Sequence, residues 1–343
     1  MKKLFKALIT MSVLMTLGAC AKTEKSNEAN DGIKVVTTFY PVYDFTTKIV
    51  GDNGEVSMLV TGEVEPHDYE PSAKDIAKIQ SADVFVYSSN EMETWVSSVL
   101  ANIDTKKTKV IEASAGIELL ANEEGDEHDH EADEHDHEAD EHDEHDGHDH
   151  EAETPEHDEE EAEDHAGHNH ELDPHVWLSP LLAEQQAKNI LSGITEIDAP
   201  NKTNYEKNYN QFVEKLTNLD GEFKEAFKDA QNKTFVTQHA AFGYLANEYG
   251  LHQVSISGLT PDVEPSPKQL AALQDFVKEE QVKYIYIEQS GSSKYADTIA
   301  KATGAEILTL STLETVSTKD VKAGEDYFSI MENNLEALKK SIK

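Results

Sequence analysis

The stretch TFVTQHAAFGYLANEYGLHQVSIS, residues 234–257, alternates between two kinds of local structure. Its two ends, TFVTQH and QVSIS, are short β-rich runs, which favours strands. The residues between them, 240–249, are mainly apolar and end at a glycine, which is typical of a helix and its C-terminal cap. A strand, a helix and a second strand in this order predict a βαβ unit and therefore a parallel sheet.

The same alternation continues on both sides of this stretch. We expect helices over residues 72–80, 266–280 and 292–303, with Ser72 as an N-cap three residues before Asp75 and Pro267 as the first helical residue after Ser266. Further strand-like runs are IKVVTTF (33–39), EVSMLV (55–60), DVFVYSS (83–89), KVIEAS (109–114), VKYIYIE (282–288) and EILTLS (306–311). These runs form two groups, so the sequence predicts two parallel sheets flanked by helices.

Between the two groups, large apolar residues recur at spacings of three and four, which predicts an amphipathic helix. They are Tyr205, Tyr209, Phe212, Val213, Leu216, Leu219, Phe223 and Phe227. A helix over residues 202–229 would be roughly 40 Å long at 1.5 Å per residue, long enough to bridge two lobes as a rigid strut. The alternative is an ordinary surface helix of the second lobe that breaks at Gly221.

The expected fold is therefore α/β, with two lobes that each contain a mostly parallel sheet and are joined by a long rigid helix. A chain of 343 residues has enough length for two cores. We assign residues 33–122 and 172–199 to the N-terminal lobe, residues 200–231 to the linking helix and residues 232–343 to the C-terminal lobe.

The first twenty residues have the features of a targeting segment. Three lysines precede an apolar stretch, Leu8 to Leu17, that is too short to span a bilayer stably. The stretch ends in Leu-Gly-Ala-Cys20, which resembles the lipobox of bacterial lipoproteins and implies lipidation of this sole cysteine. The alternative is cleavage elsewhere with a buried thiol. Residues 21–32 are small and polar, as expected of a flexible tether.

The net charge of −39 is concentrated in one segment. Residues 123–171 hold 26 of the 68 acidic residues and no lysine, so the remainder has 42 acids against 29 bases, or −13. No basic stripe remains that could neutralise a phosphate backbone, and nucleic acid is an unfavourable partner. All 29 basic residues are lysine, so the chain lacks the guanidinium fork that recognises bulky oxyanions.

Segment 123–171 is also rich in histidine, and the motif HDHEADE occurs twice in succession from His128. Without large apolar residues the segment cannot offset its ordering entropy, so we expect disorder. A solvated acidic linker is the alternative to metal binding, but such a linker has no need of regularly spaced imidazoles. We expect weak binding of several ions. The twelve histidines are His128, His130, His135, His137, His142, His145, His148, His150, His157, His165, His168 and His170.

Four histidines remain outside the insert. His67 follows a strand and precedes a helix, His175 lies where the insert rejoins the fold, and His239 ends the strand TFVTQH. Glu288 ends the strand VKYIYIE in the equivalent place, and ligands of open α/β sheets bind at this carboxyl edge. Three imidazoles and a carboxylate form a set that suits tetrahedral Zn²⁺. His252 has no partner motif and is interpreted as structural.

Four motifs, EPHDYEPS (65–72), DPHVWLSP (173–180), QHAAFGYLANEYGL (238–251) and EPSPKQLA (264–271), resemble the zinc-binding solute receptors of bacterial ABC transporters. The likeness covers residues 33–340, and an acidic, His-rich insert before DPHVW is typical of the zinc members. The resemblance implies a metal site in the cleft between the lobes, with His67 and His175 from the N-terminal lobe and His239 and Glu288 from the C-terminal lobe. Manganese members usually have a carboxylate where this chain has His239, which favours zinc.

The resemblance also implies the partners: a permease and its ATPase, and a membrane reached through the lipid anchor on its outer face. We expect a monomer. A manganese receptor of the same fold and a surface adhesion lipoprotein remain as alternatives. A zinc hydrolase is disfavoured because the sequence contains no HExxH, GxSxG or phosphate loop and no separate general base near the histidine motifs.

Overall fold

A computed structural model of the chain describes residues 32–62, 64–121, 172–261, 263–289 and 293–343. Cys20, the tether and the histidines of the insert lie outside the described residues, so the predictions for them stay predictions. Within the described ranges, no helix combines the length and apolar character that crossing a membrane requires.

The N-terminal sheet has four parallel strands in the order β2-β1-β3-β4. Every residue of the central strand β3 is buried, as expected for a parallel strand covered on both faces. The strands are β1 (Ile33–Thr37), β2 (Gly54–Met58), β3 (Val84–Tyr87) and β4 (Lys109–Glu112).

The C-terminal sheet repeats this arrangement, with four parallel strands in the order β6-β5-β7-β8. They are β5 (Thr234–Thr237), β6 (His252–Ser255), β7 (Tyr284–Ile287) and β8 (Glu306–Thr309). Both sheets confirm the predicted parallel topology. In each sheet the strand order reverses direction between the two central strands, β1 and β3 in the first sheet and β5 and β7 in the second. Ligands of open α/β sheets bind near such a position.

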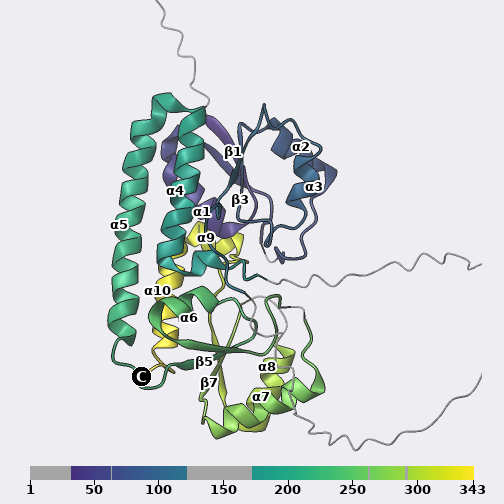
Figure 1. Cartoon of the computed structure of the whole chain (residues 1–343), viewed down its shortest axis with the longest axis vertical. Helices are drawn as coiled ribbons and strands as arrows, with labels where there is room; N and C mark the ends of the chain where they lie inside the picture. Colours follow the sequence, from purple (N-terminus) through teal and green to yellow (C-terminus); the bar gives the residue numbers. More distant parts are fainter. Residues whose placement is uncertain (1–31, 63, 122–171, 262, 290–292) are drawn as a thin grey trace, which may run out of the picture. The chain divides into compact units, whose positions relative to one another are not determined.

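Helices flank both sheets (Figure 1). Ser72 and Ser266 begin α2 and α7 through reciprocal capping boxes, and Pro267 is the first residue of α7, as predicted. The described helices of the first lobe are α1 (Tyr40–Val50), α2 (Ala73–Ser81), α3 (Val96–Leu100) and α4 (Pro180–Ile197), and those of the second are α6 (Gly243–Tyr249), α7 (Pro267–Glu279), α8 (Lys294–Thr303), α9 (Thr318–Ala323) and α10 (Tyr327–Leu338). Short 3-10 helices are η1 (Gly51–Asn53), η3 (Val176–Leu178) and η4 (Ala199–Asn201).

The long helix α5 (Lys202–Phe227) joins the lobes and runs without a break through Gly221. It packs against α1 and α4 of the first lobe and against α6 and α10 of the second. Phe212 of α5 contacts Phe45 of α1 and Phe328 of α10 by their rings, within one hydrophobic cluster that includes both lobes. The predicted linking helix is confirmed, and a shared core holds the lobes together.

Candidate metal centre

Two of the predicted ligands come from loops of the N-terminal lobe. His67 lies in the segment between β2 and α2, and this segment ends at Ser72, the N-cap of α2. His175 immediately precedes η3, whose Trp177 is fully buried. Both imidazoles are buried, with exposed fractions of 5% and 0%, and their Nε2 atoms lie 3.2 Å apart.

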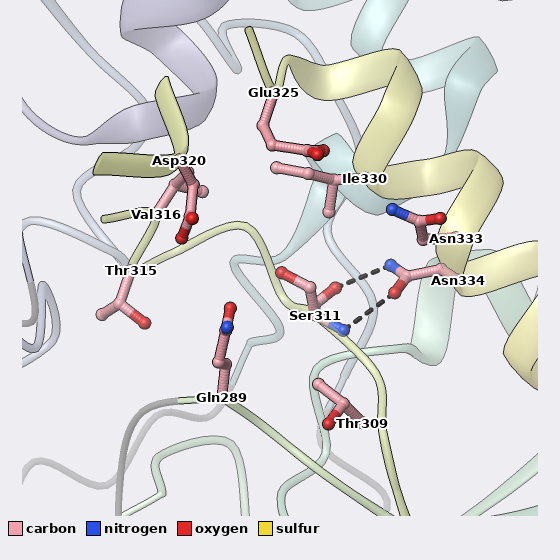
Figure 2. Close-up of a pocket in the computed structure, with 10 residues that line it drawn as sticks. All are labelled: Gln289, Thr309, Ser311, Thr315, Val316, Asp320, Glu325, Ile330, Asn333 and Asn334. Atoms are coloured by element: carbon pink, nitrogen blue, oxygen red, sulfur yellow. Dashed lines mark hydrogen bonds between the residues drawn. The ribbon is translucent and has the colours of Figure 1, made fainter. Parts of the chain in front are cut away.

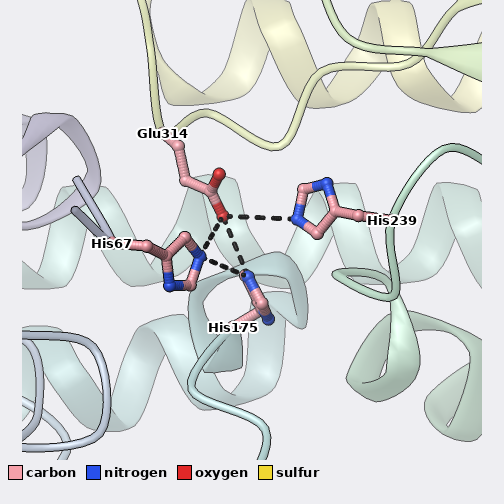
Figure 3. Close-up of side chains that lie close together, drawn as sticks. All are labelled: His67, His175, His239 and Glu314. Atoms are coloured by element: carbon pink, nitrogen blue, oxygen red, sulfur yellow. Dashed lines mark hydrogen bonds and ion pairs between the residues drawn. The ribbon is translucent and has the colours of Figure 1, made fainter. Parts of the chain in front are cut away.

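The C-terminal lobe contributes His239, which follows β5, and Glu314, which follows β8. These two residues are also buried. Oε1 of Glu314 lies 3.0 Å from Nε2 of His175, 3.7 Å from Nε2 of His67 and 3.9 Å from Nε2 of His239. Figure 3 shows the three rings directed toward this one carboxylate.

The spacing of these four donors fits a single tetrahedral ion. Each residue offers one ligand atom within 4.8 Å of the others. Zinc with arms of about 2.0–2.1 Å would place neighbouring donors roughly 3.3 Å apart, close to the separations found here. Among the described residues, the buried Nε2 atom of His239 has no hydrogen-bond partner. A buried polar atom without a partner is costly, and an ion at the centre of the group would complete its contacts.

The structure places Glu288 differently from the prediction that it is a metal ligand. Its carboxylate Oε1 lies 2.5 Å from Nδ1 of His239, on the far side of that ring from Glu314. Glu288 follows β7, which is adjacent to β5, and its carboxylate contacts the His239 ring at Nδ1 rather than at Nε2. The fourth donor of the group is Glu314, which was not among the predicted ligands.

A signal for Glu314 was nevertheless present. It follows the strand run EILTLS, and so lies past the same carboxyl edge as the three histidines. It is also the only acid between Glu306 and Asp320. The ligands predicted for the second lobe, His239 and Glu288, each end a strand run, whereas Glu314 lies five residues beyond β8.

Carboxylates contact Nδ1 of two of the imidazoles, on the side of the ring opposite Nε2. Oδ1 of Asp173 lies 2.7 Å from Nδ1 of His175, in the same way that Glu288 contacts His239. A proton on Nδ1 would be held by the carboxylate, which leaves the Nε2 lone pair for an ion and fixes the orientation of the ring. The remaining predicted histidine, His252, is exposed at the start of β6, away from the group.

Charge within the site follows from burial and from these acids. Burial disfavours the charged form of His175, but the carboxylates of Asp173 and Glu314 outweigh it and raise its pKa to about 10. At His239, burial also disfavours the charged imidazole, but the carboxylates of Glu288 and Glu314 outweigh it and raise the pKa of His239. Burial dominates at His67 and lowers its pKa. For Glu314 burial is outweighed by the neighbouring histidines, which hold its pKa well below the usual range.

A family model described as the zinc-uptake complex component A, periplasmic, named ZnuA, matches residues 35–341. The chain belongs to the ZnuA family. It is 44% identical to the high-affinity zinc uptake system protein ZnuA of Bacillus subtilis, over 99% of this chain and 98% of that protein. It is also 45% identical to the zinc-binding protein AdcA of Streptococcus pyogenes, over 99% of this chain but only 61% of AdcA. The chain thus spans about three-fifths of the length of such streptococcal relatives.

Solved structures agree with this ZnuA-family membership. The Zn(II)-bound ZnuA-like domain of Streptococcus pneumoniae AdcA is 40% identical, with a TM-score of 0.70, and the match covers 90% of this chain and 98% of that domain. The laminin-binding protein Lmb of Streptococcus agalactiae, described as having adhesin and metal-transporting activity, is 35% identical, with a TM-score of 0.72 and coverage of 91% and 100%. The family resemblance predicted from the four motifs is confirmed.

One donor of the group, His67, lies beside a pocket at the surface. His67 lines a pocket of about 740 Å³ together with Tyr69 and Trp95, whose rings pack edge to face. Asp68 and Glu70 add acidic groups to the same pocket. The other three donors do not line this pocket.

Zinc binding is expected to release protons and to weaken as the pH falls. With its pKa raised to about 10, His175 is expected to carry a proton on Nε2 at pH 7 that the ion must displace. The pKa of His239 is shifted in the same direction. Each displaced proton lowers the apparent affinity about tenfold per pH unit on the acid side of the pKa. Calorimetry in buffers of different ionisation enthalpy measures the release. An affinity that is constant from pH 6 to pH 8 would contradict these charge states.

Proposed function

We propose that the chain is an extracytoplasmic zinc receptor that captures Zn²⁺ and delivers it to the permease of an ABC transporter. The observation that carries the proposal is the buried group of three imidazole nitrogens and one carboxylate, contributed equally by the two lobes. Such a donor set suits a borderline ion such as Zn²⁺ better than Mn²⁺, which prefers oxygen ligands. The names of the relatives, a zinc uptake protein and zinc-binding proteins, support the same ion.

Competition between zinc and manganese on the purified protein tests this proposal. We expect one tight zinc equivalent that a large excess of manganese fails to displace. Tight manganese binding with little preference for zinc would favour the manganese receptor instead.

Capture and release, rather than catalysis, fit the coordination sphere. A catalytic zinc keeps a position open for water or substrate, whereas here four protein donors surround the centre of the group. A structural zinc also has four protein ligands, and the relative named as a zinc uptake protein supports an ion that is carried instead.

The proposed location depends on Cys20, the expected lipidation site. A diacylated anchor attaches a protein to a membrane stably without a spanning helix. Relatives from Streptococcus pneumoniae are named zinc-binding lipoproteins, which supports an anchor here. Replacing Cys20 with alanine is expected to release most of the protein from the membrane fraction, as measured by fractionation and immunoblotting. Full retention of that variant would contradict the lipoprotein assignment.

The insert is proposed to collect zinc weakly beside the tight site. It ends directly before residue 172, close in sequence to His175, so ions bound there would have a high local concentration near the centre. Deleting residues 126–170 is expected to remove weak zinc equivalents, to leave one tight equivalent, and to slow growth only under zinc limitation. A variant with the twelve histidines changed to glutamine keeps length and acidity and is the matched control. If the deletion abolished the tight equivalent, this division of roles would be wrong.

Adhesion is a second candidate function, because the Lmb protein is described as a bifunctional adhesin and metal transporter. The test is binding of a His67→Ala/His239→Ala double variant to immobilised laminin. Undiminished binding would indicate a surface separate from the metal centre, and no binding by the wild type would dismiss this candidate.

A further inference from the structure

The loop after β8 connects the donor Glu314 to the rest of the molecule through the preceding residues. At its start, Ser311 is paired with Asn334 of α10 by two hydrogen bonds, N–H to Oδ1 at 2.8 Å and Nδ2 to the carbonyl oxygen at 2.7 Å (Figure 2). Asn334 is itself buried. The loop is therefore anchored on one side, three residues before Glu314.

The next residue, Thr312, is almost fully buried and contacts Trp177, Glu288 and Glu314. Its carbonyl oxygen accepts a 2.8 Å hydrogen bond from Nε1 of Trp177, which lies in the N-terminal lobe two residues after His175. Its hydroxyl donates a 3.0 Å hydrogen bond to Oε2 of Glu288. The same hydroxyl lies 3.5 Å from the backbone N–H of Glu314, at the limit of hydrogen-bond distance.

The backbone between Thr312 and the donor Glu314 is strained at Leu313. Leu313 has a φ of +63°, in the left-handed region that branched apolar residues rarely adopt, and its side chain is fully buried. A strained backbone of this kind persists only where the surrounding structure holds it. The hydrogen bonds of Ser311 and Thr312 supply that restraint on one side.

We propose that Thr312 is a positioning residue that couples three of the four donors. Its hydroxyl orients Glu288, which in turn holds Nδ1 of His239. Its carbonyl fixes Trp177 beside His175, and its position in the chain sets the approach of Glu314. Thr312 contacts no ion itself, and its effect reaches the metal through these neighbours.

The expected consequence is slow release of the ion. Removing a group that orients a ligand from behind typically lowers metal affinity by about 10–100-fold. Because such a change alters the stability of the complex more than the encounter, we expect it mainly in the dissociation rate. This inference rests on the proposed zinc-binding function.

Thr312→Val removes the hydroxyl and keeps the shape of the side chain, and Thr312→Ser restores a hydroxyl. The control is Thr309→Val, at an exposed threonine of β8. Each zinc-loaded protein is mixed with excess chelator, and zinc release is followed by stopped flow. We expect T312V to keep one zinc equivalent but to release it about 10–100-fold faster, T312S to remain within about threefold of the wild type, and T309V to match the wild type.

Glu288→Gln gives a second test that keeps the backbone contacts of Thr312. Because the hydroxyl acts through Glu288, the T312V/E288Q double variant is expected to release zinc about as fast as E288Q alone, so the two effects are not additive. Wild-type rates in T312V, or fully additive effects in the double variant, would overturn the coupling. A wild-type protein without a tight zinc equivalent would instead contradict the proposed function, and with it this inference.

Discussion

Replacing His239 with alanine is expected to abolish the tight zinc site. The remaining donors could offer only two nitrogens and a carboxylate, and Glu288 would lose the imidazole that it contacts. We expect the affinity to fall at least about a thousandfold, which corresponds to about 4 kcal/mol. Isothermal calorimetry with a competing chelator measures this loss.

The matched control is His252→Ala, because His252 is exposed on β6 and lies outside the group. Zinc should raise the melting temperature of the wild type and of this control, since an ion that binds only the folded state stabilises it. It should leave the melting temperature of the H239A protein nearly unchanged. An unaltered tight equivalent in H239A would show that the ion binds elsewhere.

The second large effect separates the two glutamates. Glu314→Gln removes the negative charge at the centre of the group, where the side chains of three histidines converge. Glu288→Gln changes a group that contacts His239 from behind. We expect at least about a hundredfold loss of zinc affinity for E314Q, and about 10–100-fold for E288Q, the range typical of an orienting partner.

The exposed Glu306→Gln on β8 serves as the control for the loss of one acidic charge. Chelator competition at pH 7 gives all three affinities under one condition. If E288Q lost more affinity than E314Q, Glu288 would be restored as the direct ligand and Glu314 would have a supporting role.

Much of this architecture could be predicted from local sequence patterns. The β-rich runs and the helix starts at Ser72 and Ser266 depend on neighbouring residues, and the structure has them where the patterns indicate. The 26-residue helix α5 also follows from its own spacing of apolar residues. Three of the four clustered donors, His67, His175 and His239, lie in the motifs quoted from the sequence, so the sequence pointed to them as well.

The fourth donor depends on tertiary geometry. Both Glu288 and Glu314 follow strands of the second sheet, and sequence alone does not show which carboxylate faces Nε2 of His239. The two carboxylates differ in which ring nitrogen of His239 they approach. Glu288 is held at Nδ1, while the loop through Thr312 and Leu313 carries Glu314 to the opposite side.

We expect one zinc ion to bind between the lobes to His67, His175, His239 and Glu314. Anomalous diffraction from crystals of the zinc-loaded full chain, recorded on both sides of the zinc absorption edge, tests it most directly. We expect one strong peak about 2.0–2.2 Å from the Nε2 atoms of the three histidines and from a carboxylate oxygen of Glu314. A peak coordinated by Glu288 in place of Glu314, or found only outside this group, would contradict it.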